Sequence, residues 1–326
     1  MQDFIAIGDT VVDAFIKLKE AEVNKDRSKL LLSFGDKIPY ESVEEVFAVG
    51  NSANAAVAAA RLGLSSGLIT NLGADNNSEK CLARLKEEKV STGFVSVEEG
   101  KKTNYHYVLW YGDDRTILVK HEHYNYQFPA LGGPASKWLY LSSLGEDTMI
   151  YHGEIIEYLK KNPEVSLAFQ PGTFQLELGA DKLRDVYTRS KIVFCNVDEA
   201  GRILGMDTLG IEELLKRIKA LGPEMVVITD GPKGAYAYDG TNIYQQLPYP
   251  DIKPPFERTG AGDAFASTVV AALVLGKDLL TALQWGAVNS MSVVQQVGAQ
   301  KGLLTLEKIE EYLKSAPSEF KTKKLN

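Results

Sequence analysis

The second half of the chain alternates short apolar runs with longer amphipathic segments. Runs of strand length are followed by segments of helical length. The strands are expected at 138–141, 165–169, 192–195 and 225–229, and the helices at 153–161, 183–189, 199–204 and 212–221. Regular alternation of this kind predicts a mostly parallel sheet covered by helices on both faces. The pattern therefore predicts an α/β fold with three layers, α/β/α.

Both ends of the chain extend this pattern. Residues 4–8 form a continuous apolar run, which is typical of a strand buried on both faces. A further strand is expected at 67–72, a hairpin at 234–247, and helices at 54–62, 78–89, 263–275, 279–297 and 306–313. The first of these helices is rich in alanine, which favours helix and allows close packing on a sheet.

Two segments depart from the layered pattern and resemble partly exposed β structure. Residues 11–49 mix short alternating stretches with many charges, and residues 97–128 are rich in β-branched and aromatic side chains around a turn signal at 112–114. We expect them to form a small β-sheet lid on one domain that spans 1–326. A ligand site is expected between this lid and the core.

Composition excludes several classes of protein. The 326 residues carry a net charge of −7, so a nucleic-acid-binding surface, which would need a basic face, is not expected. The N-terminus shows no signal-type segment and no stretch is apolar enough to span a membrane, so a cytoplasmic protein is expected. The two cysteines, Cys81 and Cys195, lie in apolar segments and are read as buried thiols.

The strongest chemical signal is the segment 259–265, Thr-Gly-Ala-Gly-Asp-Ala-Phe, which leads into an apolar helix. Its glycines expose backbone N–H groups at the positive end of the helix dipole, where a phosphoryl group can bind. Asp263 beside this site could accept a proton from a hydroxyl that attacks phosphorus. The alternative is that Asp263 only caps the helix. The spacing matches neither a dinucleotide fingerprint nor a Walker loop.

Five motifs in order resemble the ribokinase (PfkB carbohydrate kinase) family. The segment 257–263 is similar to its C-terminal Gly-Ala-Gly-Asp signature, and 50–56 with Ala-Arg-Leu-Gly at 60–63 is similar to its N-terminal sugar-binding signature. The other matches are Gly8 with Asp13, the Asn-x-x-Glu of 196–199, and the Thr-x-Gly-x-x-Gly of 229–234. Together they span roughly residues 4–313. The resemblance implies a ribokinase-like fold and an ATP-dependent kinase.

The resemblance also implies roles for individual residues on the nucleotide side. Asp263 would be the general base, and the anion hole would consist of Gly260, Ala261 and Gly262. Glu199, together with Asn196, would organise Mg²⁺ and the phosphates of ATP, partly through water. The remaining nucleotide-binding residues would be Thr229, Gly231, Gly234 and Asn289. The alternatives are a capping box for the pair at 196 and 199, and a plain turn at 229–234.

On the acceptor side, Asp13 would bind hydroxyl groups, since a carboxylate accepts hydrogen bonds from two adjacent hydroxyls. Gly50, Asn51 and Asn54 would complete that pocket, although Asn54 could instead cap the helix that follows. Glu257 and Arg258 replace the family's Asp-Thr pair. This replacement leaves the binding of a monovalent cation such as potassium open.

A further cluster lies in the second lid segment. His121 and His123 would share one face of a strand, but no third metal ligand is visible in the sequence. The neighbouring aromatic residues could form a homodimer surface on the lid, stack on a nucleoside base, or pack the lid on the core. These residues are Tyr105, Tyr107, Trp110, Tyr111, Tyr124 and Tyr126.

The expected function is transfer of the γ-phosphoryl group of ATP to a hydroxyl of a small sugar. One alternative is a nucleoside kinase of the same fold. Another is a ligand-binding protein without activity, which the presence of Asp263 and its glycines disfavours because binding alone needs no base.

Overall fold

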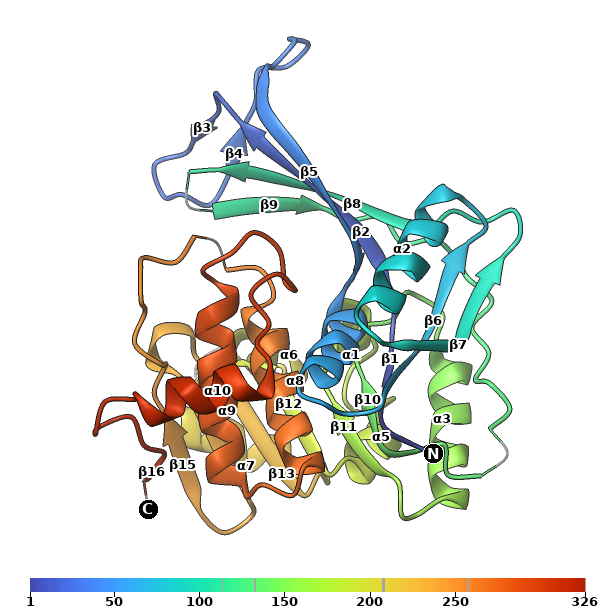
Figure 1. Ribbon diagram of the computed structural model, residues 1–326, viewed down its shortest axis with the longest axis vertical. Helices are drawn as coiled ribbons and strands as arrows, with labels where there is room; N and C mark the ends of the chain where they lie inside the picture. The colour runs from blue at the N-terminus through green and yellow to red at the C-terminus, as the bar shows by residue number, and fades with distance from the viewer. Residues whose placement is uncertain (113, 132, 207–208, 257, 326) are drawn as a thin grey trace.

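The protein is described from a computed structural model, which covers residues 1–112, 114–131, 133–206, 209–256 and 258–325 (Figure 1). A ten-stranded sheet forms its centre. From one edge to the other, the strands are β16 (Lys323–Lys324), β15 (Ile243–Gln246), β14 (Ala235–Tyr238), β13 (Met225–Thr229), β12 (Ile192–Asn196), β11 (Ser166–Phe169), β10 (Ser136–Leu141), β1 (Gln2–Ile7), β6 (Ser66–Gly73) and β7 (Ser91–Glu98). The strands from β13 to β7 are parallel and β14 to β16 are antiparallel, so the predicted mostly parallel sheet is confirmed.

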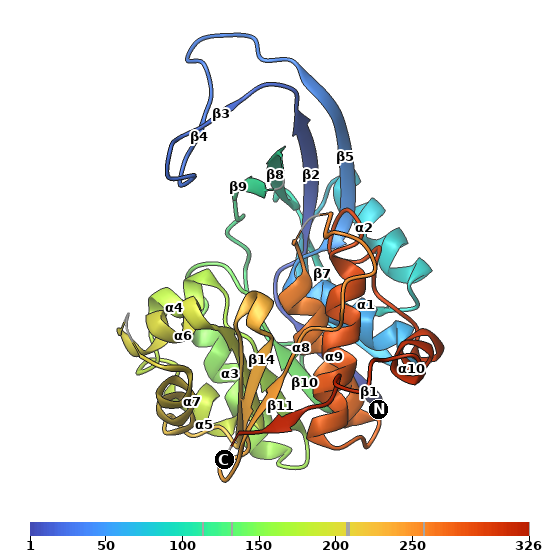
Figure 2. The ribbon, with the colours of Figure 1, turned by 90° about the vertical axis from the view of Figure 1, so that its left-hand side faces the viewer.

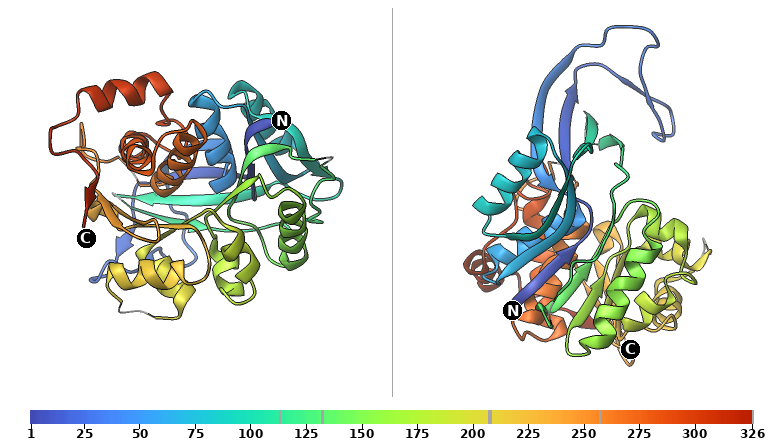
Figure 3. Two further views of the ribbon diagram at one scale, coloured as in Figure 1. Left: turned by 90° about the horizontal axis from the view of Figure 1, so that it is seen from below. Right: turned by 90° about the vertical axis from the view of Figure 1, so that its right-hand side faces the viewer.

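Two layers of helices cover this sheet, one on each face (Figure 3). One face packs against α1 (Asn51–Arg61), α2 (Asn76–Glu87), α8 (Ala261–Val274), α9 (Leu279–Val293) and α10 (Leu306–Lys314). The other face packs against α3 (Met149–Lys161), α4 (Thr173–Leu178), α5 (Arg184–Arg189), α6 (Val197–Leu204) and α7 (Ile211–Lys219). In β1, Phe4 and Ala6 face the first layer, whereas Ile5 and Ile7 face the second. This explains why β1 is apolar at every position from Phe4 to Ile7.

A second sheet lies beyond the carboxyl ends of the parallel strands (Figures 1 and 2). We call it the lid sheet, and its order is β5 (Tyr40–Val49), β2 (Val11–Leu18), β8 (Asn104–Tyr111) and β9 (Asp114–Leu118). The short pair β3 (Glu22–Val23) and β4 (Leu30–Leu31) extends from it. Parallel pairing of β2 with β8 joins the two sequence segments into one sheet.

The lid sheet is shorter in sequence than expected. The second segment was expected to remain β structure as far as 128, but β9 ends at Leu118 and residues 119–128 have no regular secondary structure. At its other end, residues 97 and 98 belong to β7 of the central sheet. The predicted turn at 112–114 includes Asp113, which lies outside the described residues.

Two helix predictions also change. α9 ends at Val293 instead of 297, because the backbone N–H groups of Gln295 and Gln296 bond three residues back and the chain turns. The short helix α4 was not expected. Within the residues described, no helix is both long and apolar enough to cross a membrane. Both cysteines are buried, as predicted, and burial raises the pKa of Cys81 to about 12.

Candidate active site

The site is built around the carboxylate of Asp263, in the first turn of α8. Gly260 is the N-cap residue of this helix, so Asp263 is not its cap. Three side-chain amides donate to Asp263 instead. Nδ2 of Asn51 lies 2.8 Å from Oδ1, Nδ2 of Asn54 lies 2.9 Å from Oδ2, and Nε2 of Gln170 lies 3.2 Å from Oδ1. The carboxylate is therefore held by α1 and by the end of β11.

Partial burial sets the basicity of this group. Desolvation raises the pKa of Asp263 above the ordinary 3.8, the amides of Asn54, Gln170 and Asn51 lower it, and the negative charge of Asp13 raises it. The net direction is upward. A raised pKa makes Asp263 a stronger base than a solvated carboxylate while leaving it able to ionise.

Gln170 directly follows β11 and was not predicted as a site residue. Its Oε1 accepts a hydrogen bond from the hydroxyl of Tyr140, a buried residue of β10. This contact orients the amide so that Nε2 faces Asp263. Tyr140 was not predicted as a site residue, because a tyrosine in an apolar strand looks like an ordinary core residue in the sequence.

The predicted acceptor-side residues come from β2 of the lid sheet and from the start of α1. Asp13 is on β2, directly opposite His106 of β8, and its Oδ1 lies 3.5 Å from Nδ1 of His106. Gly50 precedes α1 with φ of 105°, and a Cβ there would lie 2.8 Å from the carbonyl oxygen of Asp9. The structure therefore requires glycine at position 50 for packing, whatever its contact with substrate.

Asn51 and Asn54 were predicted to bind the acceptor. In the structure, both side-chain amides donate hydrogen bonds to the carboxylate of Asp263. α1 begins at Asn51, so Asn54 lies inside the helix and the alternative of Asn54 as a helix cap is wrong. Contact of either residue with an acceptor stays a prediction. Their observed role is to hold the carboxylate.

A second buried carboxylate, Asp9, was missed in the sequence. It follows Gly8 at the carboxyl end of β1 and is only 4% exposed. The hydroxyl of Tyr126 donates to its Oδ1 at 2.8 Å, and Nδ1 of His121 lies 3.0 Å from its Oδ2. An acidic residue directly after a buried parallel strand was the available signal, because ligands bind at that edge of the sheet.

These contacts also assign several residues of the second lid segment. His121 packs edge-on against Phe174, and its Nδ1 lies within hydrogen-bond distance of the carboxylate of Asp9. Within the described ranges, no group of three His, Cys, Asp or Glu residues could hold a metal ion. Tyr126 packs on Tyr151 of α3, so it joins the segment to the core. Trp110, in contrast, meets Phe256 edge-on.

The predicted nucleotide-side residues lie at the ends of neighbouring strands. Asn196 ends β12 and pairs in register with Thr229, which ends β13. Asn196 and Glu199 form a capping box, with Glu199 N donating to Oδ1 of Asn196 at 2.8 Å and Asn196 N donating to Oε2 of Glu199 at 2.9 Å. The capping alternative is thus confirmed, and contact with phosphate or metal stays a prediction.

The charge of Glu199 depends on its surroundings. Burial raises the pKa of Glu199, its hydrogen bond from the Asn196 backbone lowers it, and the charge of Asp263 raises it again. The net pKa lies above the ordinary value. A divalent cation would oppose this effect, because it favours the ionised carboxylate. The oxygen donors of this pair suit Mg²⁺, which prefers oxygen ligands and keeps several waters.

Three further nucleotide predictions have mixed support. Gly231 is exposed, with open space around it. Gly234 packs against the backbone at Gln246, where a Cβ would lie 2.1 Å from the carbonyl oxygen. Asn289 is fully buried, and its amide donates to Oγ1 of Thr268 at 2.7 Å and accepts from the backbone N–H of Leu304 at 2.9 Å. Contact of Asn289 with nucleotide stays a prediction that this burial disfavours.

The predicted anion hole has open space beside Gly262. Gly262 is exposed and nothing lies within 4 Å of the position that a Cβ would take. In the first turn of α8, the N–H of Ala261 donates to the carbonyl oxygen of Arg258 at 3.5 Å and that of Ala264 to Gly260 at 2.8 Å. The N–H groups of Gly262 and Asp263 lie between them at the positive end of the helix, where anions bind. This arrangement fits a phosphoryl group beside Asp263. Glu257, on which the monovalent cation depends, lies outside the described residues.

The chain is similar in sequence to known kinases of sugars and nucleosides. A family model described as "pfkB family carbohydrate kinase" matches residues 7–306. The chain is 29% identical to a cytidine kinase of Thermococcus kodakarensis over 76% of this chain and 88% of that protein. It is 24% identical to a 5-dehydro-2-deoxygluconokinase of Bacillus velezensis over 97% of this chain and 96% of that protein.

A solved ribokinase of Arabidopsis thaliana, in complex with ribose and ATP, has the same fold. Its TM-score is 0.80 at 20% identity, and the match covers 96% of this chain and 99% of that one. Because the family model covers almost the whole chain, the protein belongs to the pfkB family of carbohydrate kinases, which are ATP-dependent phosphotransferases with an alcohol group as acceptor.

Proposed function

We propose that this protein transfers the γ-phosphoryl group of ATP to a hydroxyl of a neutral small sugar, with Asp263 as the base. The observation that carries the proposal is the carboxylate of Asp263, which three amides hold beside the amino end of α8. A base and an anion-binding helix end are the two groups that this transfer needs next to each other.

Each group has a defined task in the reaction. Oδ1 of Asp263 already accepts from Asn51 and Gln170, whereas Oδ2 accepts only from Asn54 among the side chains described. Oδ2 therefore has the freer lone pair for the proton of the acceptor hydroxyl. The amino end of α8 stabilises the phosphoryl group in transit. Mg²⁺, held by Glu199 and Asn196 through water, would neutralise charge on the phosphates.

The charges around Asp263 favour a neutral acceptor. The partners of Asp9 and Asp13 are neighbours, since the rings of His121 and His106 pack edge-on, and the charge of Asp13 acts on Asp263. Among the described residues, the ion pairs of Asp9 and Asp13 involve only His121 and His106. A sugar phosphate or sugar acid would have to approach several carboxylates without a lysine or arginine partner. Hydroxyl groups, in contrast, donate well to carboxylates.

Two buried polar atoms on β8 support a polar acceptor. Nδ2 of Asn104 and Nε2 of His106 are buried and have no hydrogen-bond partner among the described residues. These residues alternate along the strand and so share the face that carries Asp13 in the pairing with β2. An unpaired buried polar group costs about 1–3 kcal/mol, and sugar hydroxyls, which both donate and accept, would satisfy both atoms.

A substrate panel tests the proposal. Purified protein with Mg-ATP is offered free pentoses and hexoses, the matching sugar phosphates, and ribonucleosides, and ADP release is recorded. We expect turnover with a free sugar and little with its phosphate. Turnover with nucleosides alone would support the nucleoside kinase alternative. Absence of turnover with ATP still bound would support a ligand-binding protein without activity.

Asp13→Asn tests the acceptor side. A carboxylate hydrogen bond contributes about 1.5–3 kcal/mol, so we expect a rise in acceptor KM of roughly 10- to 100-fold. The KM for ATP should change little, because Asp13 lies on the lid sheet away from β12 and β13. The matched control is Asp114→Asn, since Asp114 is an exposed acid on the same sheet. An unchanged acceptor KM would remove Asp13 from the acceptor site.

We also propose that two copies pair through the outer face of the lid sheet. This face is opposite to that of Asp13 and His106, and it exposes the apolar side chains of Val43, Tyr107 and Leu118. Exposed apolar sheet faces usually need a cover. We expect Leu118→Glu to convert a dimer to a monomer in sedimentation velocity. A wild-type protein that sediments as a monomer at high concentration would exclude this pairing.

A further inference from the structure

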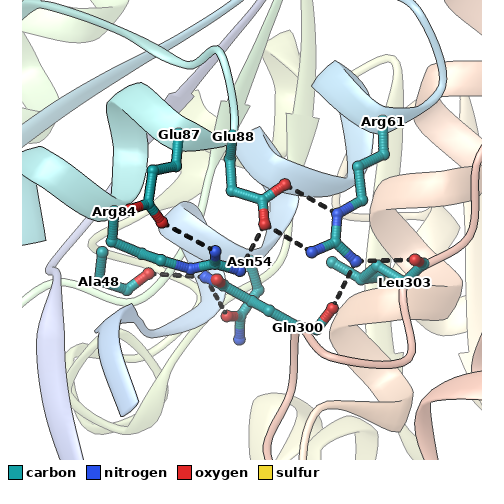
Figure 4. A network of polar contacts seen from close by, with 8 residues as sticks. All are labelled: Ala48, Asn54, Arg61, Arg84, Glu87, Glu88, Gln300 and Leu303. Carbon is teal, nitrogen blue, oxygen red and sulfur yellow. Dashed lines mark hydrogen bonds and ion pairs between the residues drawn. The ribbon is translucent and has the colours of Figure 1, made fainter.

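Asn54 uses both ends of its side-chain amide, and only one end reaches the catalytic carboxylate. Nδ2 donates to Oδ2 of Asp263, while Oδ1 accepts from Nε2 of Gln300 at 3.2 Å. Gln300 lies after α9 and is 1% exposed. Its Nε2 also donates to the carbonyl oxygen of Ala48 at 2.6 Å (Figure 4). Both hydrogens of this amide group are therefore used.

The two ends of an asparagine amide have nearly the same shape but opposite hydrogen-bonding character. If Asn54 rotated by half a turn, its oxygen would face the carboxylate of Asp263, and neither group could donate. Gln300 opposes that rotation because it offers a donor to Oδ1. We propose that Gln300 is a positioning residue for the catalytic base: it fixes the amide of Asn54 in the orientation that donates to Asp263. This inference rests on the function proposed for Asp263.

Gln300 is itself held by a network of charges. Nη1 of Arg61 donates to the carbonyl oxygens of Gln300 at 2.7 Å and Leu303 at 2.8 Å. The same guanidinium forms two hydrogen bonds with the carboxylate of Glu88, which also pairs with Arg84 of α2 (Figure 4). The side chains of Arg61 and Glu88 are only 20% and 11% exposed. Partly buried, bidentate pairs of this kind hold geometry more firmly than surface pairs.

The other contact of Gln300 is equally constrained. Ala48 is fully buried and has φ of 57°, a backbone conformation that alanine rarely adopts. Its N–H donates to Sγ of Cys81, and its carbonyl oxygen faces Gln300. Such strain persists only where the surroundings determine it. Gln300 is thus fixed by its own backbone on one side and by Ala48 on the other, and Asn54 is the group that it orients.

Gln300→Met tests the proposal, since methionine keeps the volume and removes both donors. We expect kcat to fall about 10-fold, while the KM for ATP changes little. Burial raises the pKa of Asp263, and Asn54 lowers it most among the three amides. Loss of the oriented Asn54 amide should therefore raise the pKa of Asp263 further and move the acid limb of kcat to higher pH. The other groups near Asp263 are Asp13, Glu199 and Tyr140, which the variant leaves in place.

The control separates positioning from stability. Gln246 is also 1% exposed, and its amide donates to the backbone at Leu247. It lies on β15, next to the edge strand β16. Gln246→Met should lower the melting temperature without moving the pH profile. A Gln300→Met variant that loses stability but keeps both kcat and the pH profile would overturn the proposal.

A double-mutant cycle gives the sharper test. If Gln300 acts through Asn54, Gln300→Met should have no further effect on kcat once Asn54→Ala has been made. Losses that multiply would overturn the proposal. Titration of the Asp263 carboxyl by ¹³C NMR gives a readout that needs no known acceptor. A pKa that is higher in Gln300→Met than in wild type supports the positioning role even if the proposed acceptor is wrong, and an unchanged pKa contradicts it.

Discussion

Asp263→Asn should reduce kcat by about 10³-fold, the largest effect of any substitution considered. General-base catalysis contributes about 10²- to 10⁴-fold, and an amide at this position cannot take up the proton of the acceptor hydroxyl. The fold should remain, because asparagine keeps the shape and one oxygen to accept from Asn51, Asn54 or Gln170. The KM for ATP should stay within a few-fold of wild type. The measurement is steady-state ADP release with the best acceptor.

The pH profile sharpens this prediction. The pKa of Asp263 is raised, and the base acts only in its ionised form. The value of kcat should therefore be maximal above that pKa and fall as the pH drops through it. This fall in kcat at acid pH should be absent in Asp263→Asn. The control is Asp185→Asn, an exposed acid in the first turn of α5. If Asp263→Asn turned over within a few-fold of wild type, Asp263 would not be the base.

Gly260→Ala should have the second largest effect, a loss of about 10²- to 10³-fold in kcat. Gly260 has φ of 76°, and a Cβ there would lie 2.3 Å from Cβ of Ala299 and 2.6 Å from its Cα. Neither atom can move freely, so the loop before α8 must shift and carry the first-turn N–H groups with it. Loss of a donor that stabilises a transition state costs about 10²- to 10³-fold. Steady-state kinetics and circular dichroism together check this result.

Two comparisons isolate the cause of that loss. Gly100→Ala has the same backbone constraint, with φ of 75°, but nothing lies within 4 Å of the new Cβ. It should cost some stability and leave activity unchanged. Gly262→Ala adds a methyl group into open space at the predicted anion hole, so it should reduce activity without loss of stability. Equal activity of Gly260→Ala and wild type would contradict the anion hole.

Sequence patterns predicted the layers and the location of the site because both depend on local signals. Strands that are buried on both faces are apolar along their buried length, as at 4–7 in β1 and at 192–195 in β12. The glycines and the aspartate of 260–263 lie on consecutive residues, so their chemistry is readable without a fold. The carboxyl ends of the parallel strands then bring Asn196 and Thr229 to the same edge.

The hydrogen bonds that set the pKa of Asp263 could not be predicted from local sequence patterns. The side chain of Asn54 reaches position 263 across 209 residues of sequence, and that of Gln170 across 93. Which end of an amide faces a carboxylate depends on a third residue, such as Gln300 or Tyr140, and no pattern encodes that choice. Asp9 was visible as an acid after a strand, but its burial under Tyr126 and His121 depends on an irregular segment that was predicted as β structure.

The proposed reaction moves the γ-phosphoryl group of ATP to a hydroxyl of a neutral sugar. The most direct measurement is to supply ATP labelled in its γ-phosphoryl group with Mg²⁺ and a mixture of free sugars, sugar phosphates and nucleosides, and to locate the label by mass spectrometry. We expect label in a phosphate ester of a free sugar, and no such product with Asp263→Asn. Label only in a nucleoside monophosphate, in a doubly phosphorylated sugar or in free phosphate would contradict it.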